Sequence, residues 1–338
     1  MQAHEVTEPG EPWEAVLEET LQPEATLQAP EWAALKAETG WRPRRFIVGS
    51  PDRPTLVCQV LLRQAGPIRI GYAHRGPVWR SRPDRDSLVA LVTELKKLEP
   101  EPTFIRLDPA IFDGEVAGWL RQLGFRRSFE QLQPELTMVV DLHGEEEDLL
   151  SRMPQKGRYN IKVALKKGVV VRVGDPQADR QILERLFRET ASRDGISVHP
   201  VGYYVRLLEL LGKRGELLIA EHDGRPLAAT MIEYRGRWAT YLHGASGNEG
   251  REYMPNYLLQ WEMIRRAKAR GCGYYDLRGV GPSGQPKHPY YGLRIFKRKF
   301  GGIEREYIGA YDLVLDPGRY LVYRLGQGGR KWLLRVRT

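Results

Sequence analysis

Hydrophobic and polar residues along this chain follow two similar series of patterns. Each series has three strand-like runs, an amphipathic helix, a strand, a second helix and a final strand. In the first half these elements are expected at 45–48, 55–63, 68–79, 84–98, 104–109, 116–123 and 136–142. In the second half they are expected at 216–220, 226–234, 237–244, 256–270, 274–280, 293–300 and 305–315. Because the order repeats, the sequence predicts two copies of one α/β unit.

The segments outside these two series complete the predicted organisation. A short helix is expected at 30–40, and the acidic residues before it are expected to be mobile. Between the copies, 145–168, 179–192 and 200–211 have helical patterns and are assigned to the second domain, while the tail 319–337 is expected to form helix that packs on the first. The predicted domains are therefore residues 1–142, completed by 317–338, and residues 143–316.

Composition narrows the class of protein. The chain has 338 residues, enough for two domains, and no apolar run approaches the roughly 18 residues that a membrane helix requires. The acidic N-terminus lacks the basic start and apolar block of a signal peptide, so a cytoplasmic location is expected. Cys58 and Cys272 have no second cysteine or histidine at metal-ligand spacing, so neither a metal site nor a disulfide framework is indicated.

Charge is segregated along the chain. Residues 1–31 hold eight Glu and no Lys or Arg, whereas 152–172 hold seven cations and no acid. Further basic runs occur at 287–299 and 319–337, and the net charge is +9. One such run is often only a solvated face, but three together favour a polyanionic partner such as nucleic acid or phosphates.

Several motifs together resemble those of the FemABX family, the non-ribosomal peptidyltransferases of peptidoglycan synthesis. They are YYDLRGV at 274–280, FKRKFGG at 296–302 and EYIGAYDLVLDP at 306–317, with weaker likeness in RMPQKGRYNIKVALKKGV at 152–169 and PEWAALKAETGW at 30–41. The resemblance implies an α/β fold of two tandem GNAT-like domains. It also implies one of the compact members, because no charged heptad stretch long enough for the helical hairpin of other members is present.

The resemblance assigns roles to three cations. Lys297, with Phe296 before it, matches the FK pair that acts at the aminoacyl-tRNA terminus, where a cation stabilises charge on the ester carbonyl. The alternative is a surface lysine on an amphipathic helix. Lys36 and Arg206 match positions that hold phosphates of the acceptor, although Lys36 alone reads equally well as an ordinary helix-surface residue.

Other candidates complete the expected site. Asp108, at a strand end, is expected to accept a hydrogen bond or a proton from the attacking amine; a turn-starting aspartate is the alternative. The remaining candidates are Tyr204, Tyr241 and Tyr253 for the acceptor, which read otherwise as core aromatics, and Lys162, Lys166 and Lys167 for tRNA.

Other acyl-transfer and hydrolytic chemistries are disfavoured. A GNAT acetyltransferase needs a glycine-rich turn that cradles pyrophosphate at a helix N-terminus, and residues 251–260 lack the glycines and contain Pro255. The chain also has no H-E-x-x-H and no G-x-S-x-G motif. Acetyl-CoA is therefore not the expected donor.

The expected function is transfer of an amino acid from aminoacyl-tRNA to the side-chain amine of the third residue of a peptidoglycan precursor stem peptide. The acceptor is UDP-MurNAc-pentapeptide or lipid II, which would bring a peripheral contact with a membrane-bound precursor, and no cofactor or metal is implied. Two alternatives stay open. One is a GNAT-like or FemAB-like N-acyltransferase acting on another amine, and the other is a non-catalytic RNA-binding protein.

Overall fold

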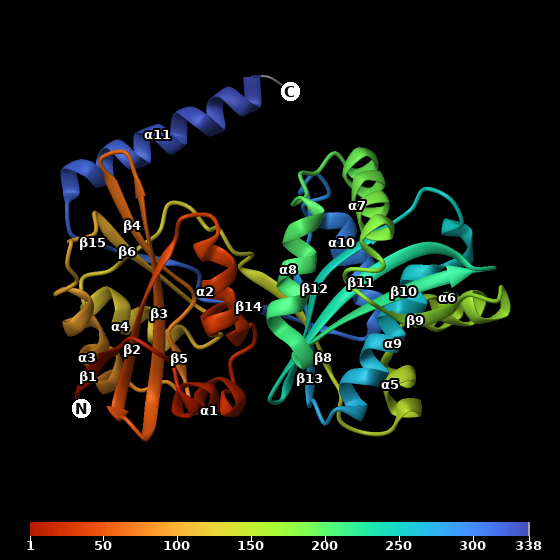
Figure 1. The fold of residues 1–338 in the computed structure, drawn as a ribbon, viewed down its shortest axis with the longest axis horizontal. Coiled ribbons are helices and arrows are strands. Elements are labelled where there is room, and N and C mark those ends of the chain that lie inside the picture. The colour runs from red at the N-terminus through yellow and green to blue at the C-terminus, as the bar shows by residue number, and fades with distance from the viewer. Residues whose placement is uncertain (337–338) are drawn as a thin grey trace. The chain divides into compact units, whose positions relative to one another are not determined.

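The computed structural model describes residues 1–336, and the chain divides into two compact units. Unit 1 comprises Met1–Glu135 and the segment from Tyr307 onward, and unit 2 comprises Leu136–Glu306 (Figure 1). The sequence placed the corresponding boundaries after residues 142 and 316. The difference arises because a strand near each boundary joins the sheet of the other unit.

Unit 1 is built on one mixed sheet with the order β1-β2-β3-β4-β6-β15-β7, and β5 pairs with β3. Its strands are β1 (Ala3–Val6), β2 (Arg42–Ser50), β3 (Arg53–Ala65), β4 (Ile68–Arg75), β5 (Val78–Trp79), β6 (Phe104–Pro109), β7 (Arg126–Arg127) and β15 (Tyr311–Val314). Its helices are α1 (Glu11–Glu19), the 3₁₀ turn η1 (Ala25–Gln28), α2 (Pro30–Ala37), α3 (Arg85–Leu95), α4 (Gly114–Gln122) and α11 (Pro317–Val336). The neighbours β4 and β6 run parallel, from Ile70 beside Phe104 to Arg75 beside Pro109.

Unit 2 repeats this plan with the sheet order β14-β8-β13-β12-β11-β10-β9. Its strands are β8 (Leu136–Asp141), β9 (Val170–Gly174), β10 (Gly215–His222), β11 (Arg225–Arg235), β12 (Trp238–Ser246), β13 (Tyr274–Gly279) and β14 (Ile303–Glu306). Its helices are α5 (Glu146–Arg152), α6 (Gln155–Lys166), α7 (Arg180–Asp194), α8 (Val201–Leu211), α9 (Pro255–Ala269) and α10 (Tyr291–Lys297), with the 3₁₀ turns η2 (Gly212–Arg214), η3 (Arg251–Tyr253) and η4 (Arg298–Phe300). The parallel pair here is β12 with β13.

The two sheets exchange one strand each. After the edge strand β7 the chain enters unit 2, where β8 lies between β13 and β14. After the edge strand β14 the chain returns to unit 1, where β15 lies between β6 and β7. The prediction of one closing strand at 305–315 is therefore wrong, because Gly309, with φ of +78°, lies in the break between β14 and β15.

The acidic N-terminal segment is ordered, so the expectation that it is mobile is wrong. β1 pairs antiparallel with β2, and α1 buries Trp13, Val16 and Leu17 against the sheet in a cluster with Ile47 and Val57. The i, i+3, i+4 spacing of these three residues is the amphipathic signal that the surrounding glutamates obscured. The opposite face of the same sheet packs against α3 and α4 through alternate residues of the strands.

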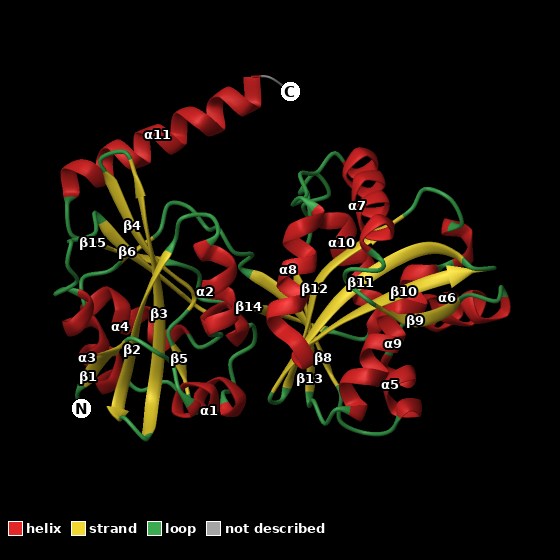
Figure 2. Ribbon diagram, in the orientation of Figure 1, coloured by secondary structure: helices red, strands yellow, loops and turns green. Residues whose placement is uncertain are grey.

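Helices cover both faces of the unit 2 sheet (Figure 2). Leu218 and Ala220 of β10 belong to the cluster that contains α9, whereas Leu217 and Ile219 belong to the cluster that contains α7 and α8. This alternation follows from the two-residue period of a strand.

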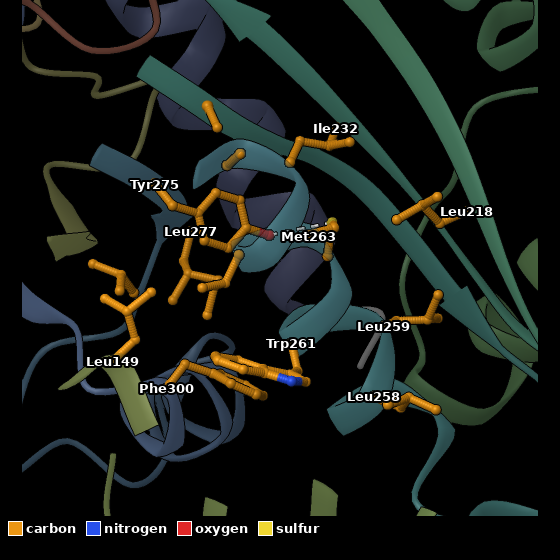
Figure 3. Close-up of a cluster of buried hydrophobic side chains, with 14 of the residues drawn as sticks. Leu149, Leu218, Ile232, Leu258, Leu259, Trp261, Met263, Tyr275, Leu277 and Phe300 are labelled. Carbon is orange, nitrogen blue, oxygen red and sulfur yellow. Dashed lines mark hydrogen bonds between the residues drawn. The ribbon is translucent and has the colours of Figure 1, made fainter. Parts of the chain in front are cut away.

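The core beside α9 includes side chains from several strands and helices of unit 2 (Figure 3). Trp261 of α9 belongs to the same buried cluster as Phe300 of η4. The hydroxyl of Tyr275 on β13 contacts the sulfur of Met263 at 3.3 Å and donates to Gln260 at 2.9 Å. Phe300 thereby anchors the FKRKFGG segment to the core of unit 2, which positions the residues before it.

Candidate functional site

The parallel strands β12 and β13 separate near their carboxyl ends. They pair only from Trp238 beside Tyr274 to Thr240 beside Asp276, although β12 continues to Ser246 and β13 to Gly279. Past this point the backbone of Arg278 adopts φ of +59°, an uncommon conformation for a residue other than glycine. Carbonyl groups at the end of β13 are therefore available to side chains from other elements.

Lys297, the last residue of α10, donates hydrogen bonds to these carbonyl groups. Its Nζ donates to the carbonyl oxygen of Gly279 at 2.7 Å and to that of Arg278 at 3.2 Å, and lies 5.6 Å from the centre of the Tyr241 ring. The residue is only 3% exposed, so the alternative of a surface lysine is wrong. A cation held in a buried, polar setting interacts strongly with charge that develops nearby.

Glycines place this segment close to α6 and the end of α5. A Cβ on Gly157 of α6 would lie 2.0 Å from the carbonyl oxygen of Lys299, so the helix contacts the η4 backbone directly. Gly301, with φ of +76°, would place a Cβ 3.0 Å from the carbonyl oxygen of Arg152. The glycines of QKGRYN and KFGG therefore permit backbone approaches that no side chain would allow.

Aromatic side chains surround the lysine. Phe296 is half-buried and makes edge-on contacts with Tyr257 and Phe300, each at 5.2 Å between ring centres. Tyr241 is half-buried on β12, and burial raises the pKa of its hydroxyl to about 12, so the phenol is neutral at pH 7. Phe296 thus belongs to the packing that positions Lys297, whereas Tyr241 places its ring beside the cation.

Helix α8 carries the next candidates. Tyr204 is buried, stacks on Phe187 at 3.9 Å, and accepts a hydrogen bond from the backbone of His199 at 3.1 Å, so it is a core residue of unit 2. Its neighbour Tyr203 stacks on the His199 ring at 4.0 Å. Burial raises the pKa of Tyr203 to about 12, against the opposing effect of the Arg278 charge. The more exposed tyrosine of the pair therefore faces Arg278, a neighbour that the sequence did not identify.

The remaining candidates of unit 2 are exposed or half-exposed. Arg206 is exposed on α8 and forms an ion pair with Glu209 at 3.6 Å, and Tyr253 of η3 packs on the His222 ring at 4.4 Å. The last three candidates, Lys162, Lys166 and Lys167, are all exposed on α6 or directly after it. Because Gly157 allows α6 to pack directly against η4, these three lysines lie on a helix that contacts the FKRKFGG segment.

Unit 1 contains Asp108 in a network of buried charges. Asp108 is 1% exposed, accepts a hydrogen bond from the Tyr72 hydroxyl at 2.9 Å, and pairs with Arg75 at 3.4 Å. Arg75 also pairs with Glu24 at 3.1 Å. Burial raises the pKa of Asp108 to about 6, against the opposing effects of Arg75 and Tyr72. A carboxyl group of this kind changes protonation state close to neutral pH.

A row of rings connects Asp108 to Lys36. Lys36 Nζ lies 4.4 Å from the centre of the Trp32 ring, Trp32 contacts His74 edge-on at 5.8 Å, and His74 lies 3.8 Å from the Tyr72 ring. Burial and the Lys36 charge lower the pKa of His74 to about 3, so the imidazole is neutral at pH 7. Burial also lowers the pKa of Lys36, with a contribution from Arg63.

The sequence did not single out Tyr72, His74 and Arg75, which all come from the strand sequence YAHR. The signal was the spacing of Tyr72 and His74, two residues apart on β4 and therefore on one face of the sheet. The expected strand at 68–79 contains both residues, but its pattern does not mark them as a polar pair. Arg75 had no comparable signal, because its partners Glu24 and Asp108 are distant in the sequence.

The described residues form neither a cluster of metal ligands nor a helix that could span a membrane. Within residues 1–336, no group of three or more His, Cys, Asp or Glu side chains is arranged to hold a metal ion. Over the same residues, each helix is either too short or too polar to cross a bilayer.

Comparison with known proteins identifies a family and relatives of this chain. The FemAB family model matches residues 119–225 and 221–327, which together exceed half of the chain. The chain is 24% identical to the lipid II:glycine glycyltransferase of Staphylococcus epidermidis and 25% identical to that of Staphylococcus aureus, in each case over 87% of this chain and 89% of the relative.

Solved structures confirm the predicted fold of two tandem GNAT-like units. The crystal structure of FemX is 22% identical, with a TM-score of 0.86 over 94% of this chain and 99% of that one. A tandem GNAT protein from the clavulanic acid biosynthesis pathway is 14% identical, with a TM-score of 0.50 over 92% and 98% of the two chains. The resemblance read from the motifs is thereby confirmed, and this chain belongs to the FemAB family.

Proposed function

We propose that this protein is an aminoacyltransferase that moves an amino acid from aminoacyl-tRNA to the side-chain amine of the third residue of a peptidoglycan precursor stem peptide. Support comes from the relatives named lipid II:glycine glycyltransferases, whose name specifies a peptidoglycan precursor and an amino acid. The acceptor is lipid II or UDP-MurNAc-pentapeptide, and the reaction takes place in the cytoplasm, where aminoacyl-tRNAs are made.

The observation that carries this proposal is the burial of Lys297 in the FKRKFGG segment, with its Nζ held by carbonyl groups at the end of β13. Attack of an amine on the aminoacyl ester creates negative charge on the carbonyl oxygen, and a fixed cation stabilises that charge. The new amide bond forms as the bond to the ribose oxygen breaks. The amine loses its proton, and Asp108 is the proposed acceptor of that proton or of its hydrogen bond.

Further residues have proposed roles in binding. Lys36 and Arg206 are proposed contacts of the acceptor's diphosphate, and Tyr241 and Tyr253 are proposed contacts of the rest of the acceptor. Since Tyr204 is buried under Phe187 and His199, its contribution is to hold the neighbouring Tyr203 in place. Lys162, Lys166 and Lys167 form a basic row on α6 for the tRNA backbone.

Acetyl-CoA fits the structure poorly as a donor. At the N-terminus of α9, residues 251–257 contain no glycine, and Pro255 at the first helical turn has no N–H to offer a pyrophosphate. Isothermal titration calorimetry with acetyl-CoA is expected to show no saturable binding. Tight binding would favour the alternative of an acyl-CoA-dependent N-acyltransferase.

The test of the proposal is Lys297→Met with a matched control. Transfer from charged tRNA is expected to fall by roughly a hundredfold or more in kcat, the scale for loss of one preorganised electrostatic group. Because the two carbonyl partners of the buried Nζ lose their donor, the variant is also expected to lose about 1–3 kcal/mol of stability, so rates are measured well below its unfolding temperature.

Lys299→Met removes the same charge two residues away and is expected to keep most of the activity. If both variants keep full kcat, or if Lys297→Met raises only KM, Lys297 has no role in catalysis. An RNA-binding protein without catalysis would show a loss of RNA affinity in Lys297→Met and no turnover in the unaltered protein.

A further inference from the structure

Helix α11 has an inner face that is fixed to the sheet of unit 1. Tyr320 is 3% exposed, and its hydroxyl donates to Asp312 of β15 at 2.7 Å. One turn further along, Tyr323 donates to Glu130 at 3.1 Å and packs its ring on Phe104 at 5.0 Å. The helix begins after Asp316, whose carboxylate accepts a hydrogen bond from the backbone of Arg319 at 2.9 Å. The orientation of the helix about its own axis is therefore set by two tyrosines.

The opposite face of the same helix is apolar and open to solvent. Leu321, Val322 and Leu325 are 55%, 58% and 68% exposed. Their spacing of i, i+1 and i+4 places them side by side on a helix, so they form one contiguous patch. Figure 1 shows the start of α11 lying across the end of the unit 1 sheet beside β4. Exposed apolar residues in such a group mark an interaction surface, unlike the single ones that are common on any protein.

The charge of α11 indicates what this surface meets. The sequence from Pro317 to Val336 contains five Arg or Lys residues and no Asp or Glu. Arg319 and Arg324, which flank the patch, are both exposed. Of the two, Arg319 also forms a surface ion pair with Asp316 at 3.5 Å. A helix with an apolar stripe flanked by cations is the pattern of segments that lie in the plane of an anionic bilayer, with the stripe among the acyl chains and the cations among the headgroups.

We infer that α11 docks this protein on an anionic lipid surface through Leu321, Val322 and Leu325, with Arg319 and Arg324 contacting headgroup phosphates. The helix lies flat on the surface and does not cross it. This inference rests on α11 alone and stands apart from the proposed transfer reaction. If the acceptor of that reaction is lipid-linked, docking of unit 1 brings the enzyme to the surface where its substrate resides.

The test measures binding of the full chain to lipid vesicles, so it needs no substrate. Vesicles of phosphatidylcholine containing about a third phosphatidylglycerol are expected to sediment the protein, and vesicles of phosphatidylcholine alone much less. The variant Leu321→Gln, Val322→Gln, Leu325→Gln is expected to bind about tenfold more weakly or worse while its unfolding temperature hardly changes, because these side chains are exposed. Arg319→Gln is expected to reduce the difference between the two vesicle types.

A matched control removes equally exposed apolar side chains elsewhere. Leu132, Ile196 and Ile303 are 51%, 49% and 62% exposed, and their combined replacement by Gln is expected to leave vesicle binding unchanged. Equal losses in the two triple variants would mean that general surface hydrophobicity drives sedimentation, which would overturn the assignment to α11.

A site-specific probe gives an independent readout. Both native cysteines, Cys58 and Cys272, are buried, so a cysteine introduced as Leu325→Cys can be labelled selectively with an environment-sensitive fluorophore. Its emission is expected to shift to the blue on anionic vesicles, whereas the same label at Leu132→Cys is expected not to respond. A blue shift that appears with rising protein concentration and no lipid would instead assign the patch to self-association, and an absent shift in both conditions would refute a docking role.

Discussion

The two units contain the same parallel strand pair, yet the pairs differ at their carboxyl ends. In unit 1, β4 and β6 stay paired through six residue pairs, from Ile70 beside Phe104 to Arg75 beside Pro109. In unit 2, β12 and β13 pair over three residues and then separate after Thr240 and Asp276. Strands that stay paired keep their backbone groups bonded to each other, whereas strands that separate leave backbone groups available to side chains from other elements.

Different chemistry occupies the two strand ends. In unit 1, the side chains of Arg75, Asp108 and Glu24 neutralise one another in a buried network, and Tyr72 completes it. In unit 2, Lys297 interacts with backbone carbonyl groups beside Tyr241. The same fold therefore has two different strand ends. In unit 1 the strand end is stabilised by ion pairs between side chains, and in unit 2 it binds the Lys297 cation through backbone carbonyl groups. The difference supports a division of labour, in which the separated pair of unit 2 takes the reacting ester.

The largest expected effect that tests this comparison is on stability in unit 1. Arg75→Met leaves Glu24 and Asp108 as buried carboxylates without their partner, which is expected to cost about 3–5 kcal/mol. The guanidinium also donates to the carbonyl oxygen of Pro134 at 2.8 Å and stacks on Tyr307 at 4.2 Å, beside the two points where the chain passes between the units. Hydrogen–deuterium exchange is expected to speed up in β4 and β6 first.

The matched control is Arg278→Met in unit 2. Arg278 shares the positive φ of Arg75, +59° against +53°, but is half-buried, so the same substitution is expected to cost about 1 kcal/mol. Equal destabilisation by the two variants would contradict the view that only the strand end of unit 1 depends on paired buried charge.

A smaller effect concerns the protonation of Asp108. Its folded pKa of about 6 lies above the usual value of 3.8, so the carboxylate form, which is the proposed proton acceptor, is lost as the pH falls through 6. The value of kcat/KM is expected to decrease about tenfold per pH unit below 6, and Asp108→Asn is expected to abolish this limb along with most activity. If the limb persists in the Asn variant while stability falls, Asp108 has only a structural role in the Arg75 network.

The smallest expected effect is on tRNA binding, which is proposed to involve unit 2 and not unit 1. Replacing Lys162, Lys166 and Lys167 by Ala is expected to raise KM for charged tRNA. The slope of log KM against the logarithm of the salt concentration is expected to decrease by up to about one for each phosphate contact that is lost. In unit 1, Lys96 and Lys97 are exposed at the end of α3, and their replacement by Ala is expected to leave the salt slope unchanged. A similar change in both variants would show that tRNA responds to overall charge and not to α6.

Much of the fold could be predicted from local patterns. The helix expected at 84–98 is observed as α3, because Leu88, Leu91, Val92 and Leu95 repeat at helical spacing and Asp84 caps the first turn through the backbone of Ser87 at 2.8 Å. The repeated order of strands and helices also predicted the two-fold plan, which the tandem GNAT-like structures confirm. These features depend on residues within a few positions of each other, so one sequence is enough to detect them.

The candidate residues divide in the same way. The motif around Lys297 was visible in the sequence, but its burial was not, since it depends on the end of β13 lying opposite α10. Tyr204 was chosen as a contact residue, although the stack on Phe187 places it in the core. Residue type and motif named the candidate side chains, and only packing decided which of them are accessible.

The sheet that β8 and β15 each join is the clearest feature that only the tertiary structure determines. Both strands have the apolar pattern that any sheet of this fold accepts, so the local sequence does not distinguish the sheet of unit 1 from that of unit 2. Partners such as Asp312 of β15 and Arg106 of β6, whose side chains meet at 2.7 Å across 206 positions of sequence, decide the pairing. The sequence by itself therefore determined most of the elements and their order, but not α1 or the division of 305–315 into β14 and β15. The sheet that each strand joins depends on contacts between residues far apart in the sequence, such as ion pairs between buried side chains. An unpaired charge in the interior destabilises the fold by more free energy than local strand propensity contributes.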